Sequence, residues 1–369
     1  MLNPLTYGLL ATAPLLASAL PKHDDRTQGL QQLSKKAGKL YFGTAADIPG
    51  TGELQDKYYM QQYKNTKDFG QTTPANAMKA SDSTMLTQPR LTISPVDSNG
   101  KILRCHALVW HQQAPAWVTN GNWTKPTLLA AIDNHVRKTL AHFGDNCYAW
   151  DVVNEALNDD GTYRESLYYN VTGTEYISTA FRAAAETVKQ HKLKVKLYYN
   201  DYNIETPGAK ASAAAKIVTG LQGQNIHIDG VGLQGQNIHI DGVGLQSHFT
   251  VGGTPNTTTQ ATNMQNFAKL GVEVAITELD IRTTTPPTDA AKKQQVVDYK
   301  NTVAACTQTK KCVGITLWDF DDTYSWIPST FPGQGYGSPW YQPDGANTPL
   351  VRKEAYDGIV QGLTVSRGY

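Results

Sequence analysis

Eight short apolar segments recur along this chain and constrain its fold more than any other feature. They lie at residues 40–47, 69–76, 102–110, 147–155, 194–202, 240–249, 273–280 and 312–320. Most are separated by stretches with apolar residues at three- and four-residue spacing, such as 127–143 and 174–191, which is the period of an amphipathic helix. Strand and helix alternate, so the pattern predicts a right-handed parallel (β/α)8 barrel with its function on the loops after the strands.

The connection after the second strand departs from this alternation. Between Asn76 and Lys101 no amphipathic helix is visible, whereas a parallel crossover needs about a dozen residues that are usually helical. We therefore expect a shortened or irregular second barrel helix.

An identical tandem repeat, LQGQNIHIDGVG, fills residues 221–232 and 233–244 before the sixth strand. Two short copies cannot build a solenoid. Each copy offers the same strand, but only the second is followed by Gln246-Ser247-His248, so we expect it to supply the barrel strand. The first copy is then expected in a surface loop near the N-terminal face of the barrel.

The repeat also creates a glycine pattern, Gly230-Val-Gly232-Leu-Gln-Gly235, that matches a dinucleotide-binding fingerprint. The context does not fit, because a second strand-like segment follows where a phosphate-binding helix would begin. We expect no nucleotide site and no cofactor.

The charge balance gives no reason to expect a charged partner. The chain has 369 residues with 33 basic and 32 acidic side chains, so no strong field would attract nucleic acid. No Pro/Ser/Gly-rich linker divides it, and barrels of this size commonly form one domain. We expect a neutral partner and a monomer.

Several features indicate a secretory route. Residues 1–20 are apolar with a small-residue Ala-Ser-Ala near the end, as in a signal peptide; Pro4 and Pro14 and the short length argue against a membrane anchor. Acceptor sequons occur at Asn122, Asn170 and Asn256.

The four cysteines fit the same oxidising route. Cys105 and Cys147 are each expected to open a strand, and the first residues of neighbouring parallel strands would lie side by side. Cys306 and Cys312 flank a polar turn that would let their β-carbons meet. Two disulfides, Cys105 with Cys147 and Cys306 with Cys312, are expected.

Two of the strands end in carboxylic acids. The segment 147–157, CYAWDVVNEAL, is a buried-type strand that delivers Asn154 and Glu155 at its C-terminal end. An alternative interpretation makes Glu155 a first-turn helix acid favoured by the helix dipole. The segment 273–280, EVAITELD, closes in the same way on Glu278 and Asp280. Paired strand-end glutamates are what a glycosidase needs, because one carboxyl protonates the leaving oxygen while the other attacks the anomeric carbon or activates water.

These motifs, WDVVNEAL and ITELD, together with FGQTTPANAMK and RCHALVWHQQAPAWV, resemble those of fungal endo-1,4-β-xylanases of glycoside hydrolase family 10. The resemblance covers roughly residues 37–362. It departs from the family pattern at Met78-Lys79-Ala80, where the family continues with tryptophan and a longer segment that ends in a helix.

The resemblance implies that Glu155 is the acid/base and Glu278 the nucleophile of a retaining mechanism. It implies that His248 and Asp280 keep Glu278 ionised and oriented, although a lone histidine is more often structural. Other side chains are expected to bind sugar: Asn76, Lys79, His106, Trp110, Asn154, Tyr202, Gln246, Trp318 and Trp326. Each tryptophan is equally suited to a core position.

No metal is expected. His106 and His111 would point to opposite faces of a strand, and no HExxH pattern exists.

The resemblance, together with the secretory features, implies a secreted, extracellular, retaining endo-1,4-β-xylanase that cleaves xylan and xylo-oligosaccharides. Residues 21–369 would form one catalytic domain without a separate carbohydrate-binding module. A β-1,4-glucanase with the same machinery, or a sugar-binding barrel without activity, are the alternatives. The second would need neither glutamate.

Overall fold

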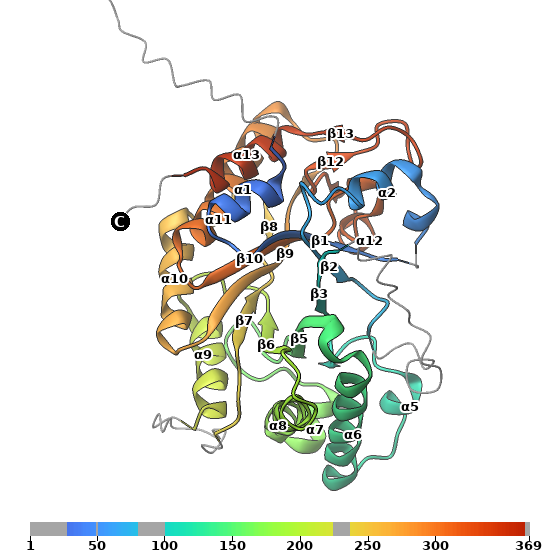
Figure 1. The fold of residues 1–369 in the computed structure, drawn as a ribbon, viewed down its shortest axis with the longest axis vertical. Coiled ribbons are helices and arrows are strands. Elements are labelled where there is room, and N and C mark those ends of the chain that lie inside the picture. Colours follow the sequence, from blue (N-terminus) through green and yellow to red (C-terminus); the bar gives the residue numbers. More distant parts are fainter. Residues whose placement is uncertain (1–27, 49–50, 80–99, 224–236, 366–369) are drawn as a thin grey trace, which may run out of the picture.

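The computed structural model describes residues 28–48, 51–79, 100–223 and 237–365. Each of the eight apolar segments contributes a strand, and parallel pairing closes these strands into a barrel (Figure 1). The barrel strands, in spatial order, are β1 (Tyr41–Ala46), β2 (Gln71–Pro74), β3 (Ile102–Cys105), β5 (Cys147–Asn154), β6 (Lys196–Asp201), β7 (Gly242–Leu245), β9 (Glu273–Thr284) and β10 (Cys312–Leu317). The (β/α)8 prediction is confirmed.

Helices surround the barrel (Figure 1). The helices are α1 (Leu30–Lys36), α2 (Lys57–Tyr63), α5 (Ala116–Thr119), α6 (Lys125–Phe143), α7 (Leu167–Thr172), α8 (Glu175–His191), α9 (Ala209–Leu221), α10 (Thr257–Lys269), α11 (Asp289–Gln308), α12 (Ile327–Thr330) and α13 (Glu354–Leu363). The remaining short strands are β4 (Val109–Trp110), β8 (His248–Thr250), β11 (Gln334–Gly335), β12 (Trp340–Tyr341) and β13 (Val351–Arg352).

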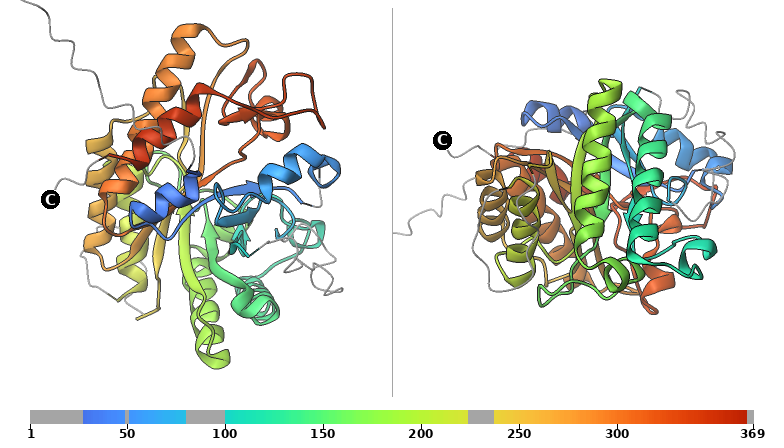
Figure 2. Two further views of the ribbon diagram at one scale, coloured as in Figure 1. Left: turned by 45° about the horizontal axis from the view of Figure 1, so that its top comes forward. Right: turned by 90° about the horizontal axis from the view of Figure 1, so that it is seen from below.

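Helix α6 shows why the apolar spacing predicted the outer layer. Leu128, Ile132, Val136 and Leu140 recur every fourth residue and are all buried, so one stripe of the helix faces the barrel. Thr124 caps the first turn by accepting from the backbone of Thr127. Helices α6 and α8 lie side by side along the outside of the barrel (Figure 2).

Two of the expected strands are divided where they reach the C-terminal face of the barrel. The segment 102–110 forms β3 and β4, and 240–249 forms β7 and β8. The breaks contain His106 and Gln246, whose side chains would otherwise alternate with their neighbours across the sheet. Both side chains line the cleft described below.

The expected shortening of the second helix concerns residues 80–99, which lie outside the described residues. The described chain ends at Lys79 and resumes at Gly100, two residues before β3. Within the described ranges, no helix is both long and apolar enough to span a bilayer.

The second copy of the repeat supplies the sixth barrel strand, since β7 spans Gly242–Leu245. The first copy is not wholly a loop as expected: Leu221 is buried at the end of α9, because the helix extends into the copy. Residues 224–236 lie outside the described residues, including Gly230, Gly232 and Gly235 of the glycine pattern.

The chain ends that border this segment lie next to each other. The backbone nitrogen of Ile238 donates to the carbonyl of Leu221 (2.7 Å). A β-carbon placed on Gly223 would be 3.1 Å from the backbone nitrogen of Asn237. Deleting one copy leaves a single glutamine between Gly223 and Asn237, which this short gap accommodates.

We therefore predict that the protein without residues 221–232 keeps its activity and gains stability. A shorter loop loses less entropy on closure, by about 0.6 kcal/mol for each halving of its length. Denaturant unfolding and a hydrolysis assay of both proteins measure this. A folded deletion protein without activity would show that the duplicated residues contribute to the site.

Both expected disulfides are present. Cys105 and Cys147 have Cα atoms 5.8 Å apart, and Cys306 and Cys312 have Cα atoms 5.3 Å apart. The expected position of Cys105 at the start of a strand is wrong. Cys147 opens β5, but Cys105 is the last residue of β3, and Cys147 pairs with Leu103 in the ladder.

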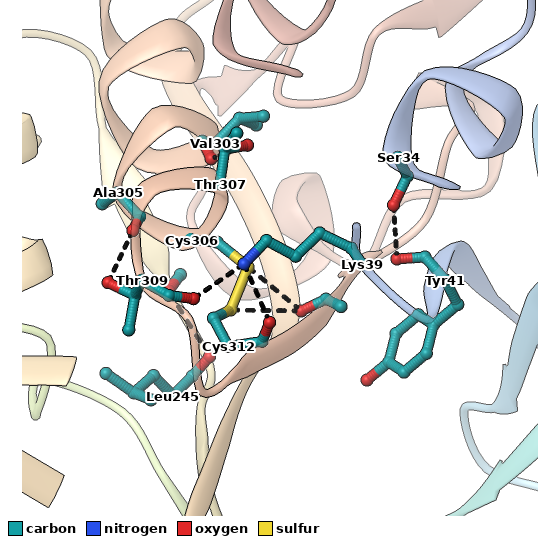
Figure 3. Close-up of a disulfide and its surroundings, with 12 residues drawn as sticks. Ser34, Lys39, Tyr41, Leu245, Val303, Ala305, Cys306, Thr307, Thr309 and Cys312 are labelled. Atoms are coloured by element: carbon teal, nitrogen blue, oxygen red, sulfur yellow. Dashed lines mark hydrogen bonds between the residues drawn. A yellow bond between two sulfur atoms is a disulfide. The ribbon is translucent and has the colours of Figure 1, made fainter. Parts of the chain in front are cut away.

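The second disulfide fastens the turn between α11 and β10 (Figure 3). Lys39, which precedes β1, donates from Nζ to the carbonyls of Thr309 (2.7 Å) and Cys312 (3.1 Å). The buried ammonium group thus ties the same turn to the start of the first strand, close to where the barrel closes.

Candidate active site

A cleft of about 780 Å³ lies at the C-terminal ends of the barrel strands. It is lined by most of the candidate site residues: Asn76, Lys79, His106, Trp110, Asn154, Glu155, Tyr202, Gln246, His248, Glu278, Trp318 and Trp326. Asp280 is fully buried behind this surface, against His248. The sequence motifs thus converge on one cavity, as expected for the carboxyl ends of barrel strands.

Glu155 follows the last residue of β5 and does not continue the strand. Its backbone nitrogen donates to the carbonyl of Asn200 in β6 (2.9 Å), but its φ is +55°, in the left-handed region. The carboxyl group accepts from Nε2 of Gln246 (3.0 Å). Glu155 therefore lies in the cleft at a turn after the strand, and not in the first turn of a helix.

Glu278 lies within β9, and its carboxyl group is almost completely buried. His248 Nε2 is 3.2 Å from Glu278 Oε2, and His248 Nδ1 is 2.9 Å from Asp280 Oδ2. The indole of Trp326 donates to the same oxygen of Asp280 (2.8 Å). One imidazole thus bridges two carboxyl groups, and Asp280 fixes the ring against β9.

The bridge affects both pKa values. Burial alone would lower the pKa of His248, but Asp280 and Glu278 outweigh it and raise that pKa to about 10. Burial alone would raise the pKa of Glu278, but the hydrogen bond from His248 and the nearby imidazole of His106 lower it overall. At neutral pH the site thus holds an ionised Glu278 beside an imidazolium.

Replacing His248 by asparagine is expected to raise the pKa of Glu278, because burial is then opposed by fewer favourable contacts. The acid limb of kcat/KM should move to higher pH by about one unit or more, which is the size of pKa shift that the loss of a close opposite charge causes.

In the unaltered protein, the stability that His248 contributes should be complete below its ordinary pKa of 6.5 and be lost as the pH rises towards about 10.

A pH–rate profile and thermal melts across pH measure these two effects. An unchanged acid limb in the asparagine variant would show that His248 does not control the ionisation of Glu278.

Side-chain amides lie between the two glutamates. Asn200 donates from Nδ2 to Oε1 of Glu278 (2.8 Å), and Gln246 contacts Glu155. Both amides also contact the side-chain amide of Asn154, which lies near the indole nitrogen of Trp110. These groups offer hydrogen bonds to a hydroxyl-rich ligand beside both carboxyl groups.

His106 is fixed by a charged pair inside the barrel. Asp151 forms a buried ion pair with Arg104, and Nδ1 of His106 lies 2.9 Å from Oδ2 of Asp151. Burial alone would raise the pKa of Asp151, but Arg104 and His106 lower it overall. Because an ionised carboxylate only accepts, Nδ1 carries a proton and Nε2 is left for another partner.

One wall of the cleft combines a cation with aromatic rings. Lys79 donates from Nζ to Oδ1 of Asn76 (3.0 Å) and lies 4.5 Å from the ring centroid of Trp110. Burial lowers the pKa of Lys79. The Trp318 ring meets His106 edge-on at 5.5 Å. Aromatic faces and buried donors together suit pyranose rings.

The sequence profile named Glycosyl hydrolase family 10 matches residues 29–238 and 233–361. The chain belongs to this family. The two matches of the family 10 profile overlap only within the repeat, so the duplication interrupts an otherwise continuous match.

Curated proteins of this kind include endo-1,4-beta-xylanase D of Talaromyces funiculosus, which is 49% identical over 345 residues, 92% of this chain and 78% of the relative. An endo-1,4-beta-xylanase of Agaricus bisporus is 44% identical over 90% of this chain and 94% of the relative. A solved GH10 xylanase from Bispora sp. MEY-1 with xylobiose has a TM-score of 0.82 and 51% identity, and the match covers 90% of this chain and 99% of that one.

Two polar groups beside Glu155 in this family 10 site were not expected from the sequence. His111, considered only as a metal ligand, has Nδ1 3.9 Å from Oε2 of Glu155. Burial lowers the pKa of His111. Glu155 acts to raise that pKa, and the cations Arg164 and Lys210 act to lower it further. Arg164 also lines the cleft. His111 belongs to the motif RCHALVWHQQAPAWV, but it is far from Glu155 in the sequence, so the motif did not indicate this contact.

Carboxylates at another part of the cleft were also missed. Asp47, Glu53 and Asp319 line the cavity, and Asp47 accepts from the side-chain amide of Asn76. Burial, together with neighbouring acids, raises the pKa of Glu53 to about 7. Among the described residues, no group of three histidine, cysteine or acidic side chains has the arrangement of a metal site.

Proposed function

We propose that this family 10 chain is a retaining endo-1,4-β-xylanase, in which Glu278 is the nucleophile and Glu155 the acid/base. The proposal rests above all on the different surroundings of the two glutamates. Glu278 is held ionised by an imidazolium, whereas the carboxyl group of Glu155 meets an amide at 3.0 Å and a histidine only at 3.9 Å. Two carboxyl groups in one cleft with separate tasks are what double displacement requires.

In the first step, Glu278 attacks the anomeric carbon while Glu155 gives its proton to the leaving glycosidic oxygen. The bond from carbon to that oxygen breaks, and a covalent glycosyl-enzyme forms. The hydrogen bond from Asn200 and the imidazolium of His248 hold the attacking carboxylate in place.

In the second step, the same Glu155 acts as a base. Glu155 gave its proton to the leaving group in the first step, so its carboxylate now takes a proton from water. The water attacks the anomeric carbon from the side that the leaving group vacated, Glu278 is released, and the anomeric configuration is retained. We infer that Asn154 contacts the 2-hydroxyl of the sugar bound beside Glu278, a contact that strengthens in the transition state.

We infer that the remaining cleft residues bind xylose units. Lys79, His106 and Trp110, with Asn76, would form the floor of the non-reducing side, with Trp318 and Trp326 as its walls. Gln246, which donates to the carboxyl group of Glu155, would contact a sugar there. Tyr202 also lines the cleft and is linked through Arg164 to the backbone carbonyl of Glu155.

The names of the relatives support xylan as the substrate. A β-1,4-glucan differs by a hydroxymethyl group at C5 of each sugar, which needs extra room. Discrimination between the two polymers depends on how closely Lys79 and Trp318, which line the cleft, approach C5 of the bound sugar.

Purified protein on xylan and on soluble cellulose, with reducing ends counted, tests the proposal. We expect rapid release from xylan and little from cellulose. Preference for cellulose would indicate the glucanase. Binding of either polymer without release would indicate a barrel that only binds sugar.

We further propose that the protein is secreted as one catalytic domain of residues 21–369, with residues 1–20 removed. The two disulfides support an oxidising compartment. The sequons Asn122, Asn170 and Asn256 are exposed, which glycosylation requires.

A further inference from the structure

Glu155 has a backbone conformation that needs support. A residue with a β-carbon at φ of +55° is in the left-handed region, which costs on the order of 1–2 kcal/mol for most side chains. At this turn the backbone nitrogen of Glu155 still donates to the carbonyl of Asn200 in β6. The backbone carbonyl of Glu155 instead accepts a hydrogen bond from outside the strand ladder. The direction of the carboxyl group depends on how firmly this turn is held.

Arg164 holds the turn from the opposite side of a narrow loop. Its Nε donates to the carbonyl of Glu155 (3.2 Å), and its Nη2 donates to the carbonyl of Leu157 (3.1 Å). Its own backbone nitrogen donates to the carbonyl of Ala156 (2.8 Å). An isolated antiparallel bridge between Leu157 and Tyr163 closes the loop. Three consecutive carbonyls after β5 therefore bond to one residue.

The guanidinium is itself fastened to the end of β6. Nη2 of Arg164 also bonds to the phenol oxygen of Tyr202 (2.5 Å). The ring of Tyr202 has Nζ of Lys210 only 3.4 Å from its centroid, and Lys210 forms a buried ion pair with Asp201 (3.1 Å). The loop that carries Glu155 is thus tied to the strand next to β5 through a planar, forked donor that only arginine provides.

We propose that Arg164 is a positioning residue for Glu155: it sets the direction of the acid/base carboxyl group by bonding to the carbonyls of Glu155 and Leu157. This inference rests on the proposed function. Arg164 acts through the backbone turn and has no part in bond making or breaking, so its loss should harm those steps that need the proton of Glu155.

The test uses substrates whose leaving groups need different amounts of proton transfer. Arg164→Met keeps an unbranched apolar stem without the donors of the guanidinium, and Arg164→Lys keeps the charge without the fork. On xylan, kcat/KM of Arg164→Met should fall by about 10²-fold or more, the scale of lost general acid catalysis. On 2,4-dinitrophenyl β-xylobioside, whose leaving group needs no acid, kcat/KM should change little. On xylan, kcat/KM of Arg164→Lys should lie between the values of the unaltered protein and of Arg164→Met.

Azide gives an independent readout, because it attacks the glycosyl-enzyme without a base. It should raise kcat of Arg164→Met on the dinitrophenyl substrate and leave the unaltered protein unaffected. Arg137→Met is the matched control: Arg137 bonds to Asp133 and Glu186 on the outer face of α6 and α8, and its variant should match the unaltered protein on both substrates.

An equal loss on both substrates by folded Arg164→Met or Arg164→Lys, without azide rescue, would overturn the positioning role. Thermal melts of each variant show that the comparison concerns folded protein. If the unaltered protein and Glu155→Ala also fail to differ between the two substrates, the assignment of Glu155 is wrong, which separates failure of the proposed function from failure of this inference.

Discussion

Glu278→Gln is expected to lose nearly all turnover, by at least about 10⁴-fold in kcat, as other enzymes do when they lose a covalent nucleophile. The amide cannot attack the anomeric carbon, so no glycosyl-enzyme forms with any substrate. The loss should therefore be as large for 2,4-dinitrophenyl β-xylobioside as for xylan. Initial rates on both substrates measure it.

Glu273→Gln is the matched control, because Glu273 begins the same strand at the other end of the barrel, where it bonds to Tyr148 and Tyr198. This variant should retain activity even where its stability is lower. If Glu278→Gln keeps substantial turnover while folded, another group is the nucleophile.

Glu155→Ala is expected to lose most activity on xylan, by about 10²- to 10⁴-fold, because the departing sugar oxygen then leaves without a proton. On the dinitrophenyl substrate the first step should survive, and the covalent intermediate should accumulate because no base activates water. A burst of dinitrophenol followed by slow turnover, accelerated by azide, reports this directly.

Glu165→Ala removes a nearby exposed carboxyl group and should behave as the unaltered protein. A loss in Glu155→Ala that is independent of the leaving group would contradict the acid/base role.

Most of the fold was predictable because its signals are local. Strands buried on both faces read as apolar runs, and helices such as α6 show their buried stripe every fourth residue. The positions of Glu155 and Glu278 were equally readable, since each follows an apolar run and barrel topology brings such runs together. The expected strand end at Asp280 is wrong, because β9 continues to Thr284 and Glu278 lies within it.

The contacts that complete the site were not readable, because they depend on irregular backbone. Cys105 ends β3, although the apolar pattern predicts that a strand starts there, and the break containing His106 follows it. The left-handed turn at Glu155 brings Arg164, nine residues later, onto its carbonyl, and no periodic pattern encodes that reversal. His111 reaches Glu155 only because β4 pairs beside β5.

The most direct test of the account is proton NMR of the first products released from a xylo-oligosaccharide, recorded before the anomers equilibrate. Double displacement through Glu278 and Glu155 predicts that the new reducing end appears first as the β-anomer. If the α-anomer appears first, a single inverting displacement operates and the roles proposed here for both glutamates are wrong.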